Sequence, residues 1–199
     1  MKKVLLLGDS IRQGYCEYVK MSLSDVAEVY YPNTNCAFTG YIIRYLFDWK
    51  NELKIGEDVD LVHWNAGLWD ALRMPDGMPH TLLKHYEENV ERICNMIELM
   101  FPNAKMIFAT STPVQEHLFT PPIVRYNLDT KQYNKSAVEI VKNHNGYIND
   151  LYTLLANAPV EYHSDRTHYS SKEGTRIITE QVVKSIENVL GINGKKLNY

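Results

Sequence analysis

Two short segments at opposite ends of the chain carry residues that could form one catalytic site. Ser10 follows the apolar run at residues 4–7, and Asp165 and His168 stand three residues apart far along the sequence. A serine hydroxyl becomes nucleophilic when a base accepts its proton, and a histidine base needs an acid that fixes its tautomer. We therefore take Ser10 as the candidate nucleophile, His168 as its base and Asp165 as the orienting acid.

Each of these residues also has a plainer interpretation. Serine and aspartate cap helices and turns, so Ser10 could do no more than begin a helix. The pair His163 and His168 could hold a metal, but no third ligand with compact spacing stands nearby, and we expect no metal site. Arg12 occupies the place of the second glycine in a Gly-x-Ser-x-Gly turn, which argues against an ordinary α/β-hydrolase.

The elements that position these residues are predicted to alternate along the chain, strand then helix. Short apolar runs predict buried strands, and apolar residues at helical spacing predict helices. We expect one domain over residues 1–199, with an α/β fold: a three-layer α/β/α sandwich around a five-stranded parallel, flavodoxin-like sheet. The predicted strands are 3–7, 29–31, 59–64, 105–110 and 147–148, and the predicted helices are 14–27, 40–53, 81–100, 127–143 and one opened by a capping box at Ser170 and Glu173.

Two loops follow the third and fourth predicted strands, at residues 68–80 and 112–126. Both are rich in Pro, Met and aromatic residues, and both lie at the carboxyl edge of the sheet, where such folds bind ligands. We expect these loops, with Trp69 and Tyr126, to supply a wall that binds a sugar or an acyl group.

The serine and histidine segments resemble those of the SGNH (GDSL-type) hydrolases. Gly8-Asp9-Ser10 resembles the family's first block, and Asp165-x-x-His168 resembles its last. Residues 35–40 resemble the Asn-x-Gly-x-Ser-Gly block, with Ala37 in place of its first glycine and Thr39 in place of its serine. This resemblance implies a serine esterase or acylhydrolase that needs no cofactor, with the backbone N–H groups of Ser10 and Gly40 in the oxyanion hole.

The third block departs from the family pattern. The family has Gly-x-Asn-Asp, whose Asn side chain donates to the oxyanion, whereas residues 67–70 place Trp69 at that position. Asn65, at the end of the same strand, could aim its amide into the site, or Trp69 could offer its indole N–H. We favour Asn65, because an amide is the family's own chemistry, and we assign the oxyanion hole to Ser10, Gly40 and Asn65.

Composition limits the partners. The formal net charge is −3, so nothing suggests a nucleic-acid surface or a polybasic membrane anchor, and no apolar run reaches the length of a membrane span. The apolar part of residues 1–7 is too short for a secretory leader, so we expect a cytoplasmic protein, although a removed leader would leave the same sequence. Cys16, Cys36 and Cys94 are expected to be buried, reduced thiols.

The expected substrate is a small acyl ester, such as an O-acetyl group on a carbohydrate. No apolar lid is evident, and the mean hydropathy is −0.33. A lysophospholipid or a thioester remains open, because this fold hosts several substrates. Two non-catalytic alternatives are a glycan-binding domain and a phosphate-binding α/β domain. The second lacks a glycine-rich loop, because Gly8 and Gly14 alone do not make one.

Overall fold

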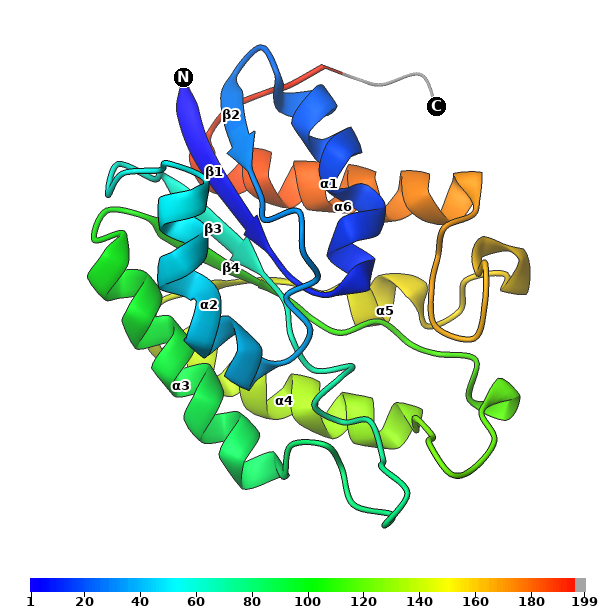
Figure 1. Ribbon diagram of the computed structural model, residues 1–199. Coiled ribbons are helices and arrows are strands. Elements are labelled where there is room, and N and C mark those ends of the chain that lie inside the picture. The colour runs from blue at the N-terminus through cyan, green and yellow to red at the C-terminus, as the bar shows by residue number, and fades with distance from the viewer. Residues whose placement is uncertain (196–199) are drawn as a thin grey trace.

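The apolar run at residues 4–7 forms the middle of a parallel sheet, as the sequence predicts. The computed structural model describes residues 1–195 and has five parallel strands in the order β2-β1-β3-β4-β5, with helices on both faces (Figure 1). The predicted fold class and the flavodoxin-like strand order are therefore confirmed. The strands are β1 (Lys2–Leu7), β2 (Ala27–Tyr30), β3 (Leu61–Trp64), β4 (Lys105–Ala109) and β5 (Tyr147–Asn149). The helices are α1 (Ser10–Leu23), α2 (Thr39–Glu52), α3 (Leu83–Met100), α4 (Asn127–Asn143), α5 (Leu151–Leu155) and α6 (Lys172–Leu190), with 3-10 turns η1 (Glu116–Leu118) and η2 (Val160–Tyr162).

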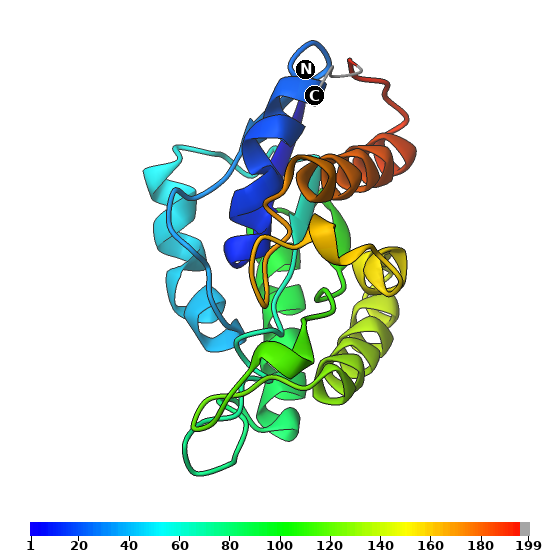
Figure 2. The ribbon, with the colours of Figure 1, turned by 90° about the vertical axis from the view of Figure 1, so that its right-hand side faces the viewer.

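Helices cover the sheet from both sides (Figure 2), and the side chains on its two faces form two separate cores. Successive side chains of β1 point to opposite faces: Leu5 and Leu7 pack with α2, α3 and α4, whereas Val4 and Leu6 pack with α1 and α6. All four side chains are at most 1% exposed. Because β1 is buried on both faces, its end, where Gly8 and Ser10 follow, is held firmly in the centre of the molecule.

Two helix starts differ from the sequence prediction. Helix α1 begins at Ser10 instead of near residue 14, because the Asp9 side chain accepts a hydrogen bond from the Ile11 N–H (2.9 Å) and caps the helix there. Helix α6 is capped by Ser171, which accepts from the Gly174 N–H (3.0 Å), and the predicted cap at Ser170 is wrong by one residue. The first difference places the candidate nucleophile on the first turn of a helix.

The two loops at the carboxyl edge of the sheet are tied to one another. The backbone of Arg73 exchanges two hydrogen bonds with that of Val124 (2.9 and 3.2 Å), and the Arg73 guanidinium makes a bidentate ion pair with Asp129 (2.7 and 2.9 Å). A groove of about 430 Å³ runs between the loops and is lined in part by Met74 and Tyr126. The two loops are thus joined and line one groove, which includes Tyr126 but not Trp69.

Two other sequence expectations can be compared with the fold. All three cysteines are free and buried, as predicted. Within residues 1–195, no helix has both the length and the apolar character needed to cross a membrane.

Candidate active site

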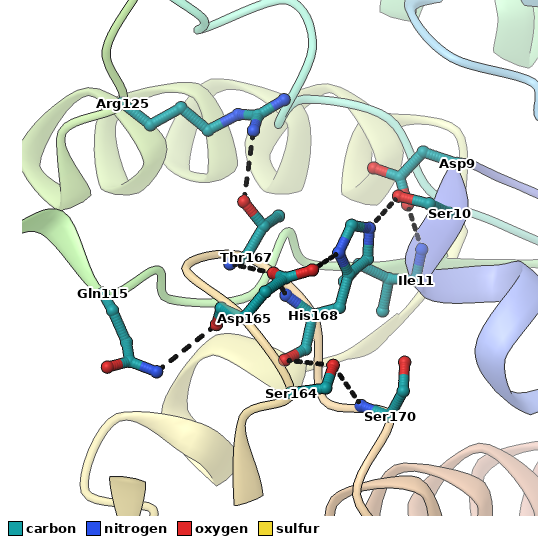
Figure 3. A network of polar contacts seen from close by, with 10 residues as sticks. All are labelled: Asp9, Ser10, Ile11, Gln115, Arg125, Ser164, Asp165, Thr167, His168 and Ser170. Carbon is teal, nitrogen blue, oxygen red and sulfur yellow. Dashed lines mark hydrogen bonds and ion pairs between the residues drawn. The ribbon is translucent and has the colours of Figure 1, made fainter. Parts of the chain in front are cut away.

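The structure brings the three candidate catalytic residues into one chain of contacts (Figure 3). Ser10 lies at the start of α1, whereas Asp165 and His168 lie in the loop that leads into α6. The Nε2 atom of His168 is 2.7 Å from the Ser10 Oγ atom, and its Nδ1 atom is 2.7 Å from an Asp165 carboxylate oxygen. A base in contact with a hydroxyl on one side and a carboxylate on the other is the arrangement that activates a serine.

Asp165 is built to remain ionised. Although partial burial acts to raise the pKa of Asp165, hydrogen bonds from the backbone N–H groups of His168 and Thr167, and from the His168 ring, lower it to about 2. The two backbone bonds are 2.8 and 2.6 Å long and both end on Oδ1, which leaves Oδ2 for the His168 ring. The carboxylate is therefore fixed in orientation and negatively charged near neutral pH.

The turn before Ser10 requires glycine. Gly8 has a φ of +158°, and a Cβ atom added there would lie 2.0 Å from the Asn65 Oδ1 atom. Asn65 follows β3 directly, and its backbone N–H donates to the Leu7 carbonyl (3.2 Å), so its side chain is carried to the end of β1. The Asn65 amide thus packs against the backbone of the turn before Ser10.

Gly40 lies at a helix start held beside the same turn. It is the second residue of α2, so its N–H has no acceptor within the helix. The buried carboxylate of Asp70 anchors this helix end by accepting from the Thr39 N–H (3.2 Å) and hydroxyl (2.6 Å). Burial raises the pKa of Asp70 to about 6, against the opposing effect of these bonds. The Cys36 N–H donates to the Gly8 carbonyl (3.0 Å) and joins the segment before α2 to the Ser10 turn.

Solved structures show where this architecture occurs elsewhere. The chain is similar to a lipase/acylhydrolase from Enterococcus faecalis, with 22% sequence identity, a TM-score of 0.75, and coverage of 99% of this chain and 100% of that one. It is also similar to an acetyl xylan esterase, AlAXEase (18%, TM-score 0.71, 92% and 99% covered), and to the psychrotrophic esterase EstA from Pseudoalteromonas sp. (15%, TM-score 0.70, 96% and 100% covered). No protein-family model matches the sequence, and no curated protein matches it significantly.

The chain has the SGNH hydrolase fold. Within this fold, the departures from the family's sequence blocks have local explanations. Ala37, which stands where the family pattern has glycine, has a φ of +48°, a left-handed conformation that costs a residue with a Cβ atom roughly 1–2 kcal/mol. The Asn35 side chain accepts from the Ala37 N–H (2.8 Å) and holds the turn in that conformation.

The two candidates for the side-chain donor of an SGNH oxyanion hole differ in placement. Asn65 is 4% exposed, and its Oδ1 atom lies 2.0 Å from where a Cβ atom on Gly8 would fall. Its amide also carries two N–H donors. Trp69 is 36% exposed. The structure therefore places the Asn65 side chain against the turn that carries Ser10, whereas Trp69 is an exposed side chain.

Sequence reasoning missed the role of Arg12 in shaping this site. Its guanidinium is completely buried and donates to the carbonyls of Pro32 (3.0 Å), Thr34 (2.6 Å) and Gly8 (3.4 Å). It therefore holds the turn before Ser10 against the segment that leads to Gly40. The only signal in the sequence was an arginine at the place of the second glycine of a Gly-x-Ser-x-Gly turn, which by itself does not indicate a buried side chain.

Sequence reasoning also missed Arg125, which lies in the loop at residues 112–126. Its Nε atom donates to the Leu68 carbonyl (2.8 Å), and its Nη1 atom donates to the Thr167 hydroxyl (3.3 Å). Figure 3 shows the guanidinium reaching over the triad from the side opposite Ser170. An arginine in a long loop is expected to be a solvated side chain, and no sequence motif indicates that Arg125 belongs to a site.

The alternative of a metal at His163 and His168 has no support in the geometry. The His163 ring packs on the Tyr169 ring, with centroids 4.0 Å apart, while His168 contacts Ser10 and Asp165. Residues 1–195 contain no group of three or more His, Cys, Asp or Glu side chains placed to hold a metal ion.

Proposed function

We propose that this protein is a serine esterase that hydrolyses small acyl esters. The observation that carries the proposal is the contact from Ser10 through His168 to Asp165, with both distances at 2.7 Å. The similarity in fold to a lipase/acylhydrolase, an acetyl xylan esterase and an esterase supports the same class of reaction.

The proposed reaction has two halves. The Ser10 hydroxyl oxygen attacks the ester carbonyl carbon while His168 Nε2 accepts the hydroxyl proton, and collapse of the tetrahedral intermediate returns that proton to the leaving alcohol. A water molecule then attacks the acyl-enzyme, with His168 again as base, and the acid leaves as Ser10 regains its proton. Asp165 holds the Nδ1–H tautomer and stabilises the imidazolium.

In both halves of the reaction, the transition state must be stabilised mainly where negative charge develops on the carbonyl oxygen. We assign its stabilisation to the backbone N–H groups of Ser10 and Gly40 and to the Asn65 amide. Ser10 is the first residue of α1 and Gly40 the second residue of α2, so both N–H groups lie at helix starts, where negative charge is favoured.

The preferred acyl group is proposed to be small, as in O-acetyl groups on carbohydrates. The cavity that Ser10 and His168 line together with Tyr15 and Ile178 measures about 10 Å³, which is about the space that one water molecule needs and leaves no room for a long acyl chain. The similarity in fold to an acetyl xylan esterase agrees with a carbohydrate ester, and exposed Trp69 and Tyr126 could stack on a sugar ring.

A series of 4-nitrophenyl esters with acyl chains of two to twelve carbons tests this proposal. We expect kcat/KM to be highest for the acetyl ester and to fall as the chain lengthens, with no effect of a metal chelator. A maximum at long chains would reject the small-acyl assignment, and no hydrolysis of any ester would favour a non-catalytic glycan-binding domain instead.

The side-chain donor of the oxyanion hole can be assigned with two variants. Asn65→Ala is expected to lower kcat by about a hundred- to a thousandfold with little change in KM, because the lost bond forms mainly in the transition state. Trp69→Phe removes the indole N–H but keeps an aromatic ring, and is expected to be mild. Steady-state kinetics on the acetyl ester measure both. A severe defect in Trp69→Phe beside a nearly normal Asn65→Ala would move the donor to Trp69.

A further inference from the structure

Arg125 has more hydrogen-bonding capacity than its contacts in the protein use. A guanidinium carries five N–H donors, and the bonds to the Leu68 carbonyl and the Thr167 hydroxyl occupy two of them. Among residues 1–195, no carboxylate lies within ion-pair distance of this guanidinium. Partial burial lowers the pKa of Arg125, but the group remains a cation at neutral pH. It is a positive charge next to the triad without a direct counter-ion.

The nearby carboxylates already have partners. Asp165 is bound to the His168 ring and to two backbone N–H groups, and Asp9 is completely buried and caps α1. Both act on Arg125 at longer range and raise its pKa, without an ion pair. Glu116, which lies in the same loop as Arg125, accepts from the Asn127 N–H (2.8 Å).

A second guanidinium stands close to the first. Arg125 and Arg166 both lie over the ring of Phe119, at 5.8 and 4.5 Å from its centroid, and the charge of Arg166 acts to lower the pKa of Arg125. Arg166 is exposed and follows Asp165 directly, so it stands at the rim of the site. Two like charges held near one another favour the binding of an anion between or beside them.

The backbone holds Arg125 in place. The residue before it, Val124, is paired to Arg73 by two backbone hydrogen bonds, and the Nε bond to the Leu68 carbonyl ties the side chain to the other loop. The guanidinium is therefore positioned before any ligand arrives, which lowers the entropy cost of binding.

We propose that Arg125, assisted by Arg166, binds a carboxylate on the alcohol part of the ester, so that the preferred substrates are acyl esters of acidic molecules such as acidic sugars. This inference rests on the proposed esterase function. The alcohol side is chosen because the leaving oxygen must receive its proton from His168, and both arginines adjoin the loop of His168: Arg125 bonds to Thr167 in that loop from a neighbouring one, and Arg166 is part of it.

Two acetyl esters that differ in one carboxylate test the inference: 4-carboxyphenyl acetate and phenyl acetate. For the wild type, kcat/KM is expected to be higher for the charged ester. Arg125→Gln is expected to lower the ratio of kcat/KM values, charged over neutral, by about ten- to a hundredfold, the strength of one charge-assisted contact. Arg125→Lys keeps the charge and is expected to restore part of the ratio. Arg92→Gln, which removes an exposed positive charge on α3, is the matched control and is expected to leave the ratio unchanged.

The ratio does not depend on how much of a variant is folded, because both esters are assayed on one preparation. An unchanged ratio in Arg125→Gln, or an equal loss on both esters, would overturn the carboxylate assignment; an equal loss would place the guanidinium at the reacting carbonyl instead. If the wild type hydrolyses phenyl acetate without preferring the charged ester, this inference fails and the esterase function stands. If it hydrolyses neither ester, both fail.

Discussion

Ser10→Ala is expected to lower kcat for the acetyl ester by about four to six orders of magnitude. No other side chain in the site can replace the Ser10 hydroxyl as nucleophile. Asp9 is buried and its carboxylate accepts from the Ile11 N–H, and without the serine His168 can activate only water. The residual rate is the part that binding and the oxyanion donors supply by themselves.

The fold of this variant is expected to be intact. The Ser10 hydroxyl contacts His168, whereas the helix cap is supplied by Asp9, so the substitution removes no bond on which α1 depends. A melting temperature close to that of the wild type, with unchanged circular dichroism, checks this. Ser24→Ala, a change at an exposed serine at the opposite end of α1 from Ser10, is the matched control and is expected to retain activity. Wild-type turnover by Ser10→Ala would reject the serine mechanism.

Asp165→Asn is expected to lower kcat by about three to four orders of magnitude while leaving KM nearly unchanged. The geometry gives the reason. Oδ1 of Asp165 accepts from the backbone N–H groups of Thr167 and His168, so the amide oxygen of an asparagine would take that place and its NH₂ group would face His168 Nδ1. Nδ1 must then be an acceptor, which puts the ring proton on Nε2, facing Ser10. In this tautomer His168 cannot accept the serine proton.

The pH dependence of kcat, measured for the wild type and for Asp165→Asn, tests this role of the Asp165 carboxylate. The pKa of Asp165 lies at about 2, below the value of a free aspartate, so the carboxylate stays ionised as pH falls and loses its charge only near that value. Loss of activity in mild acid therefore cannot arise from Asp165 in the wild type. A kcat within tenfold of the wild type for Asp165→Asn would show that tautomer control by residue 165 is not needed.

The sheet could be predicted from the sequence because its signals are local. The apolar run at residues 4–7 and the helical spacing of apolar residues in the longest helix are both properties of a few neighbouring residues. Ser10 was expected at the carboxyl edge of the sheet because it follows the first strand. Its pairing with His168 was inferred from the residue types, from Asp165 three residues before His168, and from the resemblance to the SGNH hydrolases.

The remaining parts of the site depend on contacts between residues far apart in the chain. Arg12 bonds to carbonyls some twenty residues away, and Arg125 bonds to Leu68 and Thr167 from a loop without a motif. No local spacing specifies such contacts, and an arginine in a sequence is ordinarily a solvated residue. The start of α1 differs from the prediction for a local reason. The sequence prediction begins the helix after the turn at Ser10, whereas the Asp9 side chain accepts from the Ile11 N–H and starts the helix at Ser10.

The central claim is that His168 makes Ser10 a nucleophile, and covalent labelling tests it most directly. The wild type and His168→Ala are each treated with a fluorophosphonate, which reacts with activated serines, and the modified peptide is identified by mass spectrometry. The account predicts that the wild type gains one label, on Ser10, that His168→Ala gains none in the same time, and that labelling and loss of ester hydrolysis proceed at the same rate. Hydrolysis that continues in the wild type while Ser10 stays unlabelled, or a label on a different serine that tracks the loss of activity, would contradict it.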